Sequence, residues 1–373
     1  MRPKATELAV DAALVAVCMG RTPDLPDSPD ARADFVEAVR YHRIAPLAHV
    51  MLRQSVPEVA AELRTDRDEA LMNHLRASAL LSTIAQTLAG IPWLVFKGPM
   101  LAEFAHPIPG LRFYKDLDLL VAPSDFRDAC HRMMSAGWKA LVGEDSIRGS
   151  ELPGELPMVD EHAVVLDLHW SMMVMKSLRG RFRVEAAPLL ARRVPVTLGP
   201  TSLWALDPVD ALIHVCHHAA LAGATKLGHL LDADQLARQV TDWDAVVVRA
   251  RQWRATAEVA IVLGRASRRF DTPVPVDLDR RLGLARWLSF ALVRIDETWP
   301  IESLRHDESW VRLITRSLRP GLINTVVAMT RRVAKGVWVR AQASPQKRRK
   351  PPRAELVEAY LSRVDALDEA RRE

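Results

Sequence analysis

Hydrophobic residues recur at helical spacing along the first ninety residues of the chain. The pattern predicts helices over residues 5–19, 31–55 and 66–89, and a connector rich in proline and aspartate separates the first two. Gly90 is well placed to end the third helix. The side chains expected to form the buried stripe of that helix are Leu71, Leu75, Leu80, Leu81, Ile84 and Leu88.

Short apolar runs replace the helical pattern between residues 91 and 207. They predict strands over residues 93–96, 116–121, 138–142, 162–170 and 194–198. Pro99 suits the first turn of a helix over residues 99–105. Ser124 can cap a further helix that runs to Ala136, where Gly137 can end it.

From Pro208 almost to the end of the chain the spacing is helical again. The pattern predicts helices over residues 208–223, 226–240, 242–265, 278–297 and 308–341, then a solvated linker over 343–353 and a terminal helix over 354–371. The expected fold class is therefore α+β, with a small mixed sheet flanked by helices. We expect four parts: an N-terminal helical region (1–90), an α/β core (91–207), a C-terminal helical domain (208–342) and a basic linker with a terminal helix (343–373).

Composition adds little to this picture beyond excluding some classes. Of the 373 residues, 49% are hydrophobic and 26% are charged, which is ordinary for a soluble globular protein. The net charge of +5 comes partly from residues 347–353, so it does not by itself indicate nucleic-acid binding. Three widely spaced cysteines fit a reducing compartment, and the apolar stretch at residues 8–19 is too short to cross a bilayer. We expect a cytoplasmic protein without a membrane span.

The candidate chemistry begins with two carboxylates in the strand predicted over residues 116–121. Asp116 and Asp118 lie two residues apart, so both project from one face of that strand. Such a pair is often only a solvated strand edge, but here both residues interrupt an otherwise apolar run. Because unpartnered carboxylates are costly in a partly buried place, the pattern favours a divalent metal.

A third carboxylate, Asp167, shares a strand face with His169 in the run over residues 163–170. If this strand lies beside the strand of Asp116 and Asp118, three carboxylates converge. Three carboxylates suit a site for two Mg²⁺ ions, which prefer oxygen ligands and which together can activate an attacking oxygen and stabilise a leaving one.

Lys97 and Gly98 stand at a predicted strand-to-helix turn, where they would complement such a site. A helix N-terminus suits a triphosphate, and glycine allows the backbone to approach a phosphate closely. Lys97 and Arg112 would add charged contacts, although an arginine in a loop is more often only solvated.

These motifs taken together resemble a known family. Lys97-Gly98, Arg112, the run Asp116–Val121, a helix ending in Gly137-Trp138 and the run Leu166–Trp170 follow the order of the uncharacterised bacterial nucleotidyltransferase-like family. That family belongs to the DNA polymerase β-type nucleotidyltransferase superfamily. The specific motifs lie within residues 92–170, and the resemblance in organisation covers most of residues 30–250.

The resemblance implies transfer of a nucleoside monophosphate from an NTP to an unidentified acceptor, with release of pyrophosphate. It implies metal binding and catalysis by Asp116, Asp118 and Asp167, with Lys97, Gly98 and Arg112 at the nucleotide. The acceptor is a small molecule, a protein or an RNA end. The wider superfamily carries Gly-Ser where this chain has Gly98-Pro99. That departure favours the alternative of a catalytically inactive nucleotide-binding or regulatory protein with the same fold.

Two further features leave alternatives open. His214, His217 and His218 share a helical segment at a spacing compatible with a zinc or iron site, but the apolar setting favours structural or acceptor-pocket roles, and His169 has a comparable supporting role. The basic stretch over residues 331–353 is compatible with nucleic acid or an anionic membrane surface, but a solvated tail is the favoured interpretation. A tRNA-modifying toxin is a third class, which the long chain and modest basicity do not favour.

Overall fold

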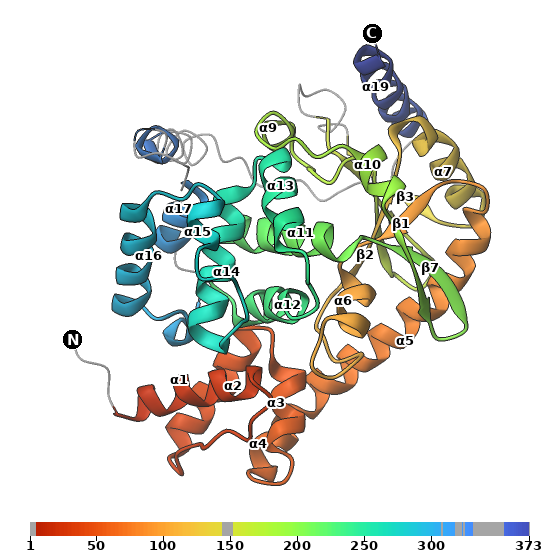
Figure 1. Cartoon of the computed structure of the whole chain (residues 1–373). Coiled ribbons are helices and arrows are strands. Elements are labelled where there is room, and N and C mark those ends of the chain that lie inside the picture. Colours follow the sequence, from red (N-terminus) through yellow and green to blue (C-terminus); the bar gives the residue numbers. More distant parts are fainter. Residues whose placement is uncertain are drawn as a thin grey trace.

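The computed structural model describes residues 5–143, 152–306, 309–317, 323, 325–330 and 354–372. A seven-stranded mixed sheet with the strand order β3-β4-β5-β2-β1-β7-β6 lies beside a larger set of helices (Figure 1). The α+β fold class predicted from the sequence is confirmed. The strands are β1 (Trp93–Val95), β2 (Asp116–Val121), β3 (Lys139–Ala140), β4 (Glu155–Val159), β5 (Val165–His169), β6 (Val194–Leu198) and β7 (Thr201–Ala205).

Strand direction changes across the sheet. The central strand β2 is parallel to β5 and antiparallel to β1, while β4 is antiparallel to both β3 and β5. The strands at β2 and β6 have the predicted bounds, and β1, β3 and β5 are shorter than predicted. The sequence pattern did not predict β7, and it did not predict β4, which lies between β3 and β5 along the chain. Pro157 interrupts its pattern, and proline is rare inside strands because it has no N–H to donate.

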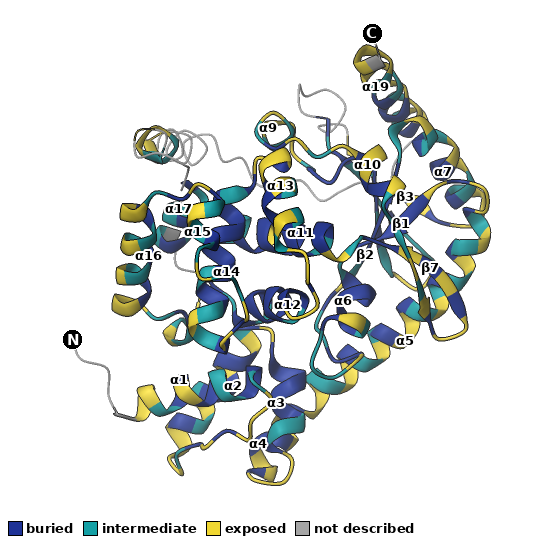
Figure 2. Cartoon of the chain, in the orientation of Figure 1, coloured by how far each residue is buried: buried dark blue, intermediate teal, exposed yellow. Residues whose placement is uncertain are grey.

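Each face of the sheet is covered by a separate hydrophobic core, and Figure 2 shows the central strands as buried. Leu117 and Leu119 of β2 face a core that includes side chains of α5 (Arg64–Thr87), α7 (Pro123–Ser135) and α19 (Ala354–Arg372). Leu120 faces the other core, which includes side chains of α11 (Pro208–Leu221) and α12 (Leu227–Ala237). Because side chains alternate along a strand, Asp116 and Asp118 project to the same side as Leu120.

The N-terminal helices are α1 (Ala5–Cys18), α2 (Pro29–Tyr41), α3 (Ala45–Leu52), α4 (Pro57–Glu62) and α5. The single helix predicted over residues 31–55 is wrong: it is broken between α2 and α3, where Arg43 has a φ of 61°. Tertiary hydrogen bonds stabilise the break, because Leu227 N donates to His42 Nδ1 at 3.2 Å and Gly228 N donates to the His42 carbonyl at 2.9 Å.

Helix α5 begins and ends within two residues of its predicted bounds, but its buried stripe differs. Leu75 is 54% exposed, whereas Ala70, His74 and Ala77 are buried. Helix α7 likewise follows the prediction, except that Ala122 rather than Ser124 precedes its first turn. Gly137 ends it with a φ of 97°.

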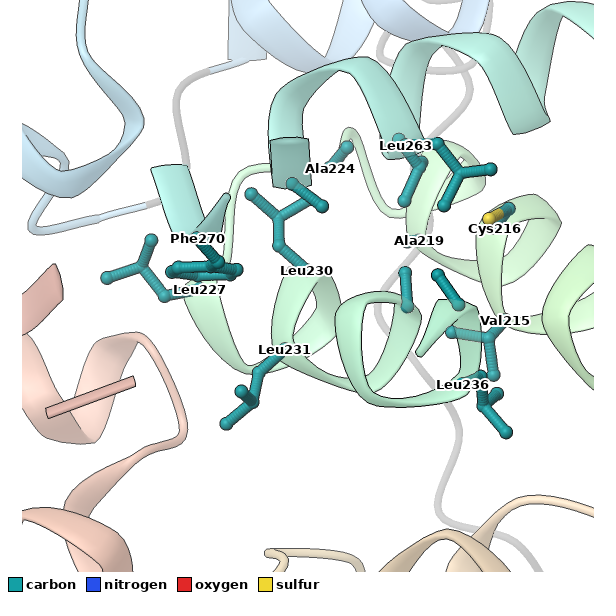
Figure 3. Close-up of a cluster of buried hydrophobic side chains, with 14 of the residues drawn as sticks. Val215, Cys216, Ala219, Ala224, Leu227, Leu230, Leu231, Leu236, Leu263 and Phe270 are labelled. Atoms are coloured by element: carbon teal, nitrogen blue, oxygen red, sulfur yellow. The ribbon is translucent and has the colours of Figure 1, made fainter. Parts of the chain in front are cut away.

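The helices after the sheet are α11, α12, α13 (Trp243–Trp253), α14 (Thr256–Phe270), α15 (Leu278–Arg281), α16 (Arg286–Thr298) and α17 (Ser309–Ser317). Figure 3 shows part of the core around α11, α12 and α14. Two predicted helices are wrong as continuous elements, because Arg254 (φ 59°) separates α13 from α14 and Gly283 (φ 80°) separates α15 from α16.

Helix α17 covers the beginning of the helix predicted over residues 308–341, and the basic stretch over 331–353 lies outside the described residues. Helix α19 matches the predicted terminal helix. In the part of the chain that the structure describes, no helix is long and apolar enough to cross a membrane.

Candidate active site

Two neighbouring strands bring the predicted carboxylates together. β2 and β5 are parallel and in register, with Asp118 directly opposite Asp167. The expectation that these two strands lie side by side is therefore confirmed. Because both residues occupy one rung of a parallel ladder, their side chains leave the sheet on the same face.

Asp118, Asp167 and His169 form a compact group of possible metal ligands. One ligand atom from each lies within 4.8 Å of the others, and no second group of this kind occurs among the described residues. Asp118 is only 2% exposed, while Asp167 is half-buried. The group combines two carboxylates with one imidazole, so it offers both oxygen and nitrogen to a cation.

Asp116 lies at the start of β2, where the site opens. It is half-buried and, with Asp118, it lines a cavity of about 380 Å³ between the sheet and the helices. Burial and the neighbouring charge of Asp118 raise the pKa of Asp116. The carboxylates therefore repel one another in the metal-free protein.

Lys97 neutralises the most buried carboxylate. Its Nζ donates to Asp118 Oδ1 at 2.9 Å, and His169 Nε2 lies 3.1 Å from the same oxygen. Burial alone would raise the pKa of Asp118, but the Lys97 ammonium and the His169 hydrogen bond hold it well below its usual range. Asp118 is thus ionised, and its charge is matched before any metal binds.

An unusual turn places Lys97 in this position. Lys97 has a φ of 64° and a ψ of −147°, and Gly98 follows with a φ of 39° at the start of α6 (Gly98–Phe104). A Cβ on Gly98 would lie 3.1 Å from the Asp116 carbonyl oxygen, so glycine lets this turn lie against β2. The strain in the turn is typical of functional sites.

The N-terminus of α6 offers few free N–H groups. Pro99 has none, and Met100 N and Leu101 N both donate to the Lys97 carbonyl. The structure therefore brings Lys97 and Gly98 to the cavity wall, but it leaves little of the N–H array expected for a triphosphate.

Glu155 is a fourth carboxylate near the site, and the sequence pattern did not predict its role there. It stands opposite His169 in the β4–β5 ladder, with its Oε2 3.4 Å from His169 Nε2. Burial and the charge of Glu155 raise the pKa of Asp167 to about 7. Alternation in residues 155–159 was the available signal, and Pro157 obscured it.

Arg112 also lines the cavity, but its guanidinium is engaged. Nε and Nη2 donate to the two carboxylate oxygens of Asp232 at 2.7 and 2.8 Å. This bidentate pair joins the loop before β2 to α12 across 120 residues of sequence. The structure thus gives Arg112 a structural partner as well as a place on the cavity wall.

The three histidines of α11 occupy different surroundings. His218 is exposed to the cavity, and its ring lies 5.5 Å from that of His229 on α12. His214 packs edge-on against Phe96, whose ring also contacts His169, while His217 packs against Phe182. Burial lowers the pKa of His214 and His217, so these two rings are neutral. Within the described residues they do not form a metal-ligand group.

The remainder of the cavity wall is rich in cationic side chains. Besides Lys97 and Arg112, these are Arg43, Lys115, Lys226 and Arg312, which come from the N-terminal helices, the loop before β2 and the helices after the sheet. A carboxylate floor beneath a cationic wall can bind a metal together with a polyanion.

A family model for uncharacterised nucleotidyltransferases matches residues 29–271. The chain belongs to this nucleotidyltransferase family. No curated protein matches the chain. The predicted likeness to a nucleotidyltransferase family is therefore confirmed.

The matched range of the nucleotidyltransferase family includes both sides of the cavity. It begins with α2 and ends with α14, so it contains the sheet, the carboxylates and the helices that carry His218 and Asp232. The cluster of Asp118, Asp167 and His169 could hold a metal ion, which fits a nucleotidyltransferase. Helices α15, α16, α17 and α19 lie beyond the matched range.

Proposed function

We propose that this protein is a Mg²⁺-dependent nucleotidyltransferase of the DNA polymerase β type, of bacterial origin. It would move a nucleoside monophosphate from an NTP to an acceptor and release pyrophosphate. The observation that carries this proposal is the position of Asp116 and Asp118 on the floor of a cationic cavity, with Asp167 directly opposite Asp118 on the neighbouring strand.

The residues at the floor fit a hard divalent cation. Asp116, Asp118 and Asp167 supply carboxylate oxygens, which Mg²⁺ prefers. Burial and the neighbouring negative charges raise the pKa values of Asp116 and Asp167, and a cation would relieve the crowding of charge. Two ions held there would supply charge neutralisation at the transferred phosphorus and activation of the acceptor oxygen.

The chain's own residues would divide the remaining tasks. Lys97 would exchange its contact with Asp118 for the triphosphate, since its ammonium already lines the cavity. Asp167 would take the proton from the acceptor hydroxyl, and His169 would hold Asp118 in place. Gly98 and Arg112 would border the nucleotide.

The acceptor would enter from the side of α11 and α12. His218 and His229 form that wall of the cavity, opposite the carboxylates, while His214 and His217 support it from the core. The acceptor is a small molecule, a protein or an RNA end. Ligand sites commonly lie between structural units such as this sheet and the helices that follow it.

The test is incubation of the purified protein with each labelled NTP and Mg²⁺ in host-cell extract, followed by identification of the labelled species. We expect one class of labelled acceptor and release of pyrophosphate, both lost in the double variant Asp116→Asn/Asp118→Asn. Asp128→Asn, at an exposed position on α7, is the matched control and should retain activity. Unchanged labelling by the double variant would contradict the proposal.

A nucleotide-binding protein without catalysis is the second candidate. It is favoured by the engagement of Asp118 Oδ1 with both Lys97 and His169, and by Pro99 at the turn. NTP binding in the presence of Mg²⁺, measured by calorimetry, with no labelled product from any extract would favour this candidate over the enzyme.

A further inference from the structure

The C-terminal helix α19 packs against the face of the sheet opposite the carboxylates. Val357, Tyr360, Leu361 and Val364 form its buried stripe, at spacings of three, one and three residues. Figure 1 shows α19 beside α7. The helix lies beyond the range matched by the family model, so it is an addition to the part that defines the family.

Ion pairs fix the position of α19 on α7. Arg127 Nη1 donates to Glu358 at 2.6 Å, and Arg127 Nε donates to Asp365 at 2.8 Å. His131 Nε2 lies 2.8 Å from the same glutamate. These contacts are near the surface and involve no residue of the candidate site.

Tyr360 differs from these residues because its hydroxyl reaches the sheet. It accepts a hydrogen bond from Trp170 Nε1 at 2.9 Å, and it lies 2.8 Å and 3.0 Å from the carbonyl oxygens of Pro153 and Glu155. Tyr360 is 1% exposed, so no solvent competes for these bonds.

The partners of Tyr360 flank the two strand ends that enter the site. Glu155 and His169 face each other across the β4–β5 ladder, and Trp170 directly follows His169. The side chain of Trp170 is in the same core as Tyr360, on the face opposite Glu155 and His169. Tyr360 therefore contacts the backbone at the start of β4 and the Trp170 side chain at the end of β5, both from the face opposite the site.

We infer that Tyr360 is a positioning residue for the candidate active site. Through this residue, α19 fixes the positions of Glu155 and His169, which support Asp118. The inference rests on the proposed function for its catalytic meaning. His169 contacts Asp118, and Glu155 contacts His169, so a displacement of either strand end would move the group that orients the carboxylate.

The test compares Tyr360→Phe with wild type in the full-length protein. Mn²⁺ serves as the probe of the carboxylates, and its affinity is measured by electron paramagnetic resonance of the free ion. The second readout is the ring signal of His169 in NMR spectra of histidine-labelled protein, assigned with His169→Gln. We expect Mn²⁺ affinity to fall about threefold to tenfold, below the usual outer-shell effect because Tyr360 acts through the backbone, and the His169 signal to shift.

Glu358→Gln is the matched control, because it weakens the attachment of α19 to α7 without touching the strand ends. It should lower thermal stability and leave both readouts unchanged. If Tyr360→Phe does not fold, Val364→Ala removes packing from the core that α19 shares with the sheet while keeping the hydroxyl, and it should produce a smaller shift in the same direction.

The outcomes separate this inference from the proposed function. A wild-type protein that binds no Mn²⁺ argues against the proposed function, while the His169 signal still reports on positioning. An unchanged His169 signal in Tyr360→Phe and in Val364→Ala overturns the inference, whatever the protein's activity.

Discussion

At the residue scale, the two aspartates that face each other across β2 and β5 favour opposite charge states. Lys97 and His169 keep Asp118 ionised, whereas burial and Glu155 raise the pKa of Asp167 to about 7. One carboxylate thus stabilises the metal-free fold through its partners, and the other destabilises it whenever it is ionised. An ionised Asp167 lowers the stability of the folded protein, but it provides negative charge where a cation would bind.

The first prediction concerns the metal-free protein at pH 8. Asp118→Asn should lower the free energy of unfolding by about 3 kcal/mol, because it leaves the Lys97 ammonium buried without its partner. Asp167→Asn should raise it by roughly 1–2 kcal/mol, less than full linkage would give because Asp167 is half-buried. Urea unfolding in excess EDTA measures both.

The gain from Asp167→Asn should depend on pH in a defined direction. The folded-state pKa of Asp167 is raised from 3.8 to about 7, so its ionisation opposes folding above that pH, and the cost shrinks as pH falls from 7 towards 4. The gain should therefore be full at pH 8 and nearly absent at pH 4. Equal gains at both values would contradict this account of Asp167.

The second prediction concerns the turn that carries Lys97. Gly98→Ala should destabilise the protein by about 1–3 kcal/mol and weaken Mn²⁺ binding, because the new Cβ would lie 3.1 Å from the Asp116 carbonyl oxygen. Gly90→Ala is the control: its φ is also positive, at 85°, but its Cβ would meet no atom within 4 Å. Thermal unfolding and Mn²⁺ titration should show that only the first variant loses affinity.

At the scale of elements, the sequence predicted those strands and helices whose own residues carry a clear pattern of apolar and polar positions. The alternation around Asp116 and Asp118 is uninterrupted, and β2 has its predicted bounds. The breaks at Arg43 and Arg254 were missed because neither residue is a glycine, although both adopt positive φ. Long-range contacts set the first of these conformations, and local propensity has no access to such contacts.

The third prediction tests the break between α2 and α3. His42 is buried there and accepts a hydrogen bond from Leu227 N, which requires a neutral Nδ1. Burial, assisted by the charge of Arg305, lowers its pKa from 6.5 to about 3. The unfolded chain therefore binds a proton that the folded chain does not, and stability falls as pH drops from 6.5 towards 3.

His42 should account for a loss of roughly 2–3 kcal/mol between pH 7 and pH 4.5. His42→Asn keeps an acceptor near Leu227 N and cannot be protonated, so its stability should fall less steeply over the same interval. Chemical unfolding at both pH values measures the difference. His162→Asn, at an exposed position, should keep the wild-type slope, and a wild-type slope in His42→Asn would show that other groups cause the loss.

At the scale of the whole molecule, the candidate site is assembled from parts that are distant in sequence. The sequence predicted the convergence of β2 and β5, because one motif in each strand pointed to the same chemistry. It could not predict that Arg112 meets Asp232 or that Lys97 neutralises Asp118, since those pairings depend on the packing of helices against the sheet. The division of the chain into four parts stays a prediction.

Variants of the Arg112–Asp232 pair can distinguish an effect on the stability of the protein from an effect on its nucleotide affinity. Both side chains are largely buried, so Arg112→Met or Asp232→Leu alone should cost about 3–5 kcal/mol by leaving one charge unpaired. The double variant removes both charges, and we expect it to be more stable than either single variant. A double-mutant cycle by thermal unfolding measures the coupling.

Nucleotide affinity in the same four proteins decides what Arg112 does besides joining the loop to α12. If Arg112 contacts the triphosphate, the double variant should regain stability and still bind each NTP with Mg²⁺ at least tenfold more weakly than wild type, since a charge-assisted contact is lost. Recovery of both properties would assign Arg112 a structural role alone. Arg112→Lys refines the comparison, because it keeps the charge but cannot form the bidentate pair, so it should lose stability and retain part of the nucleotide affinity.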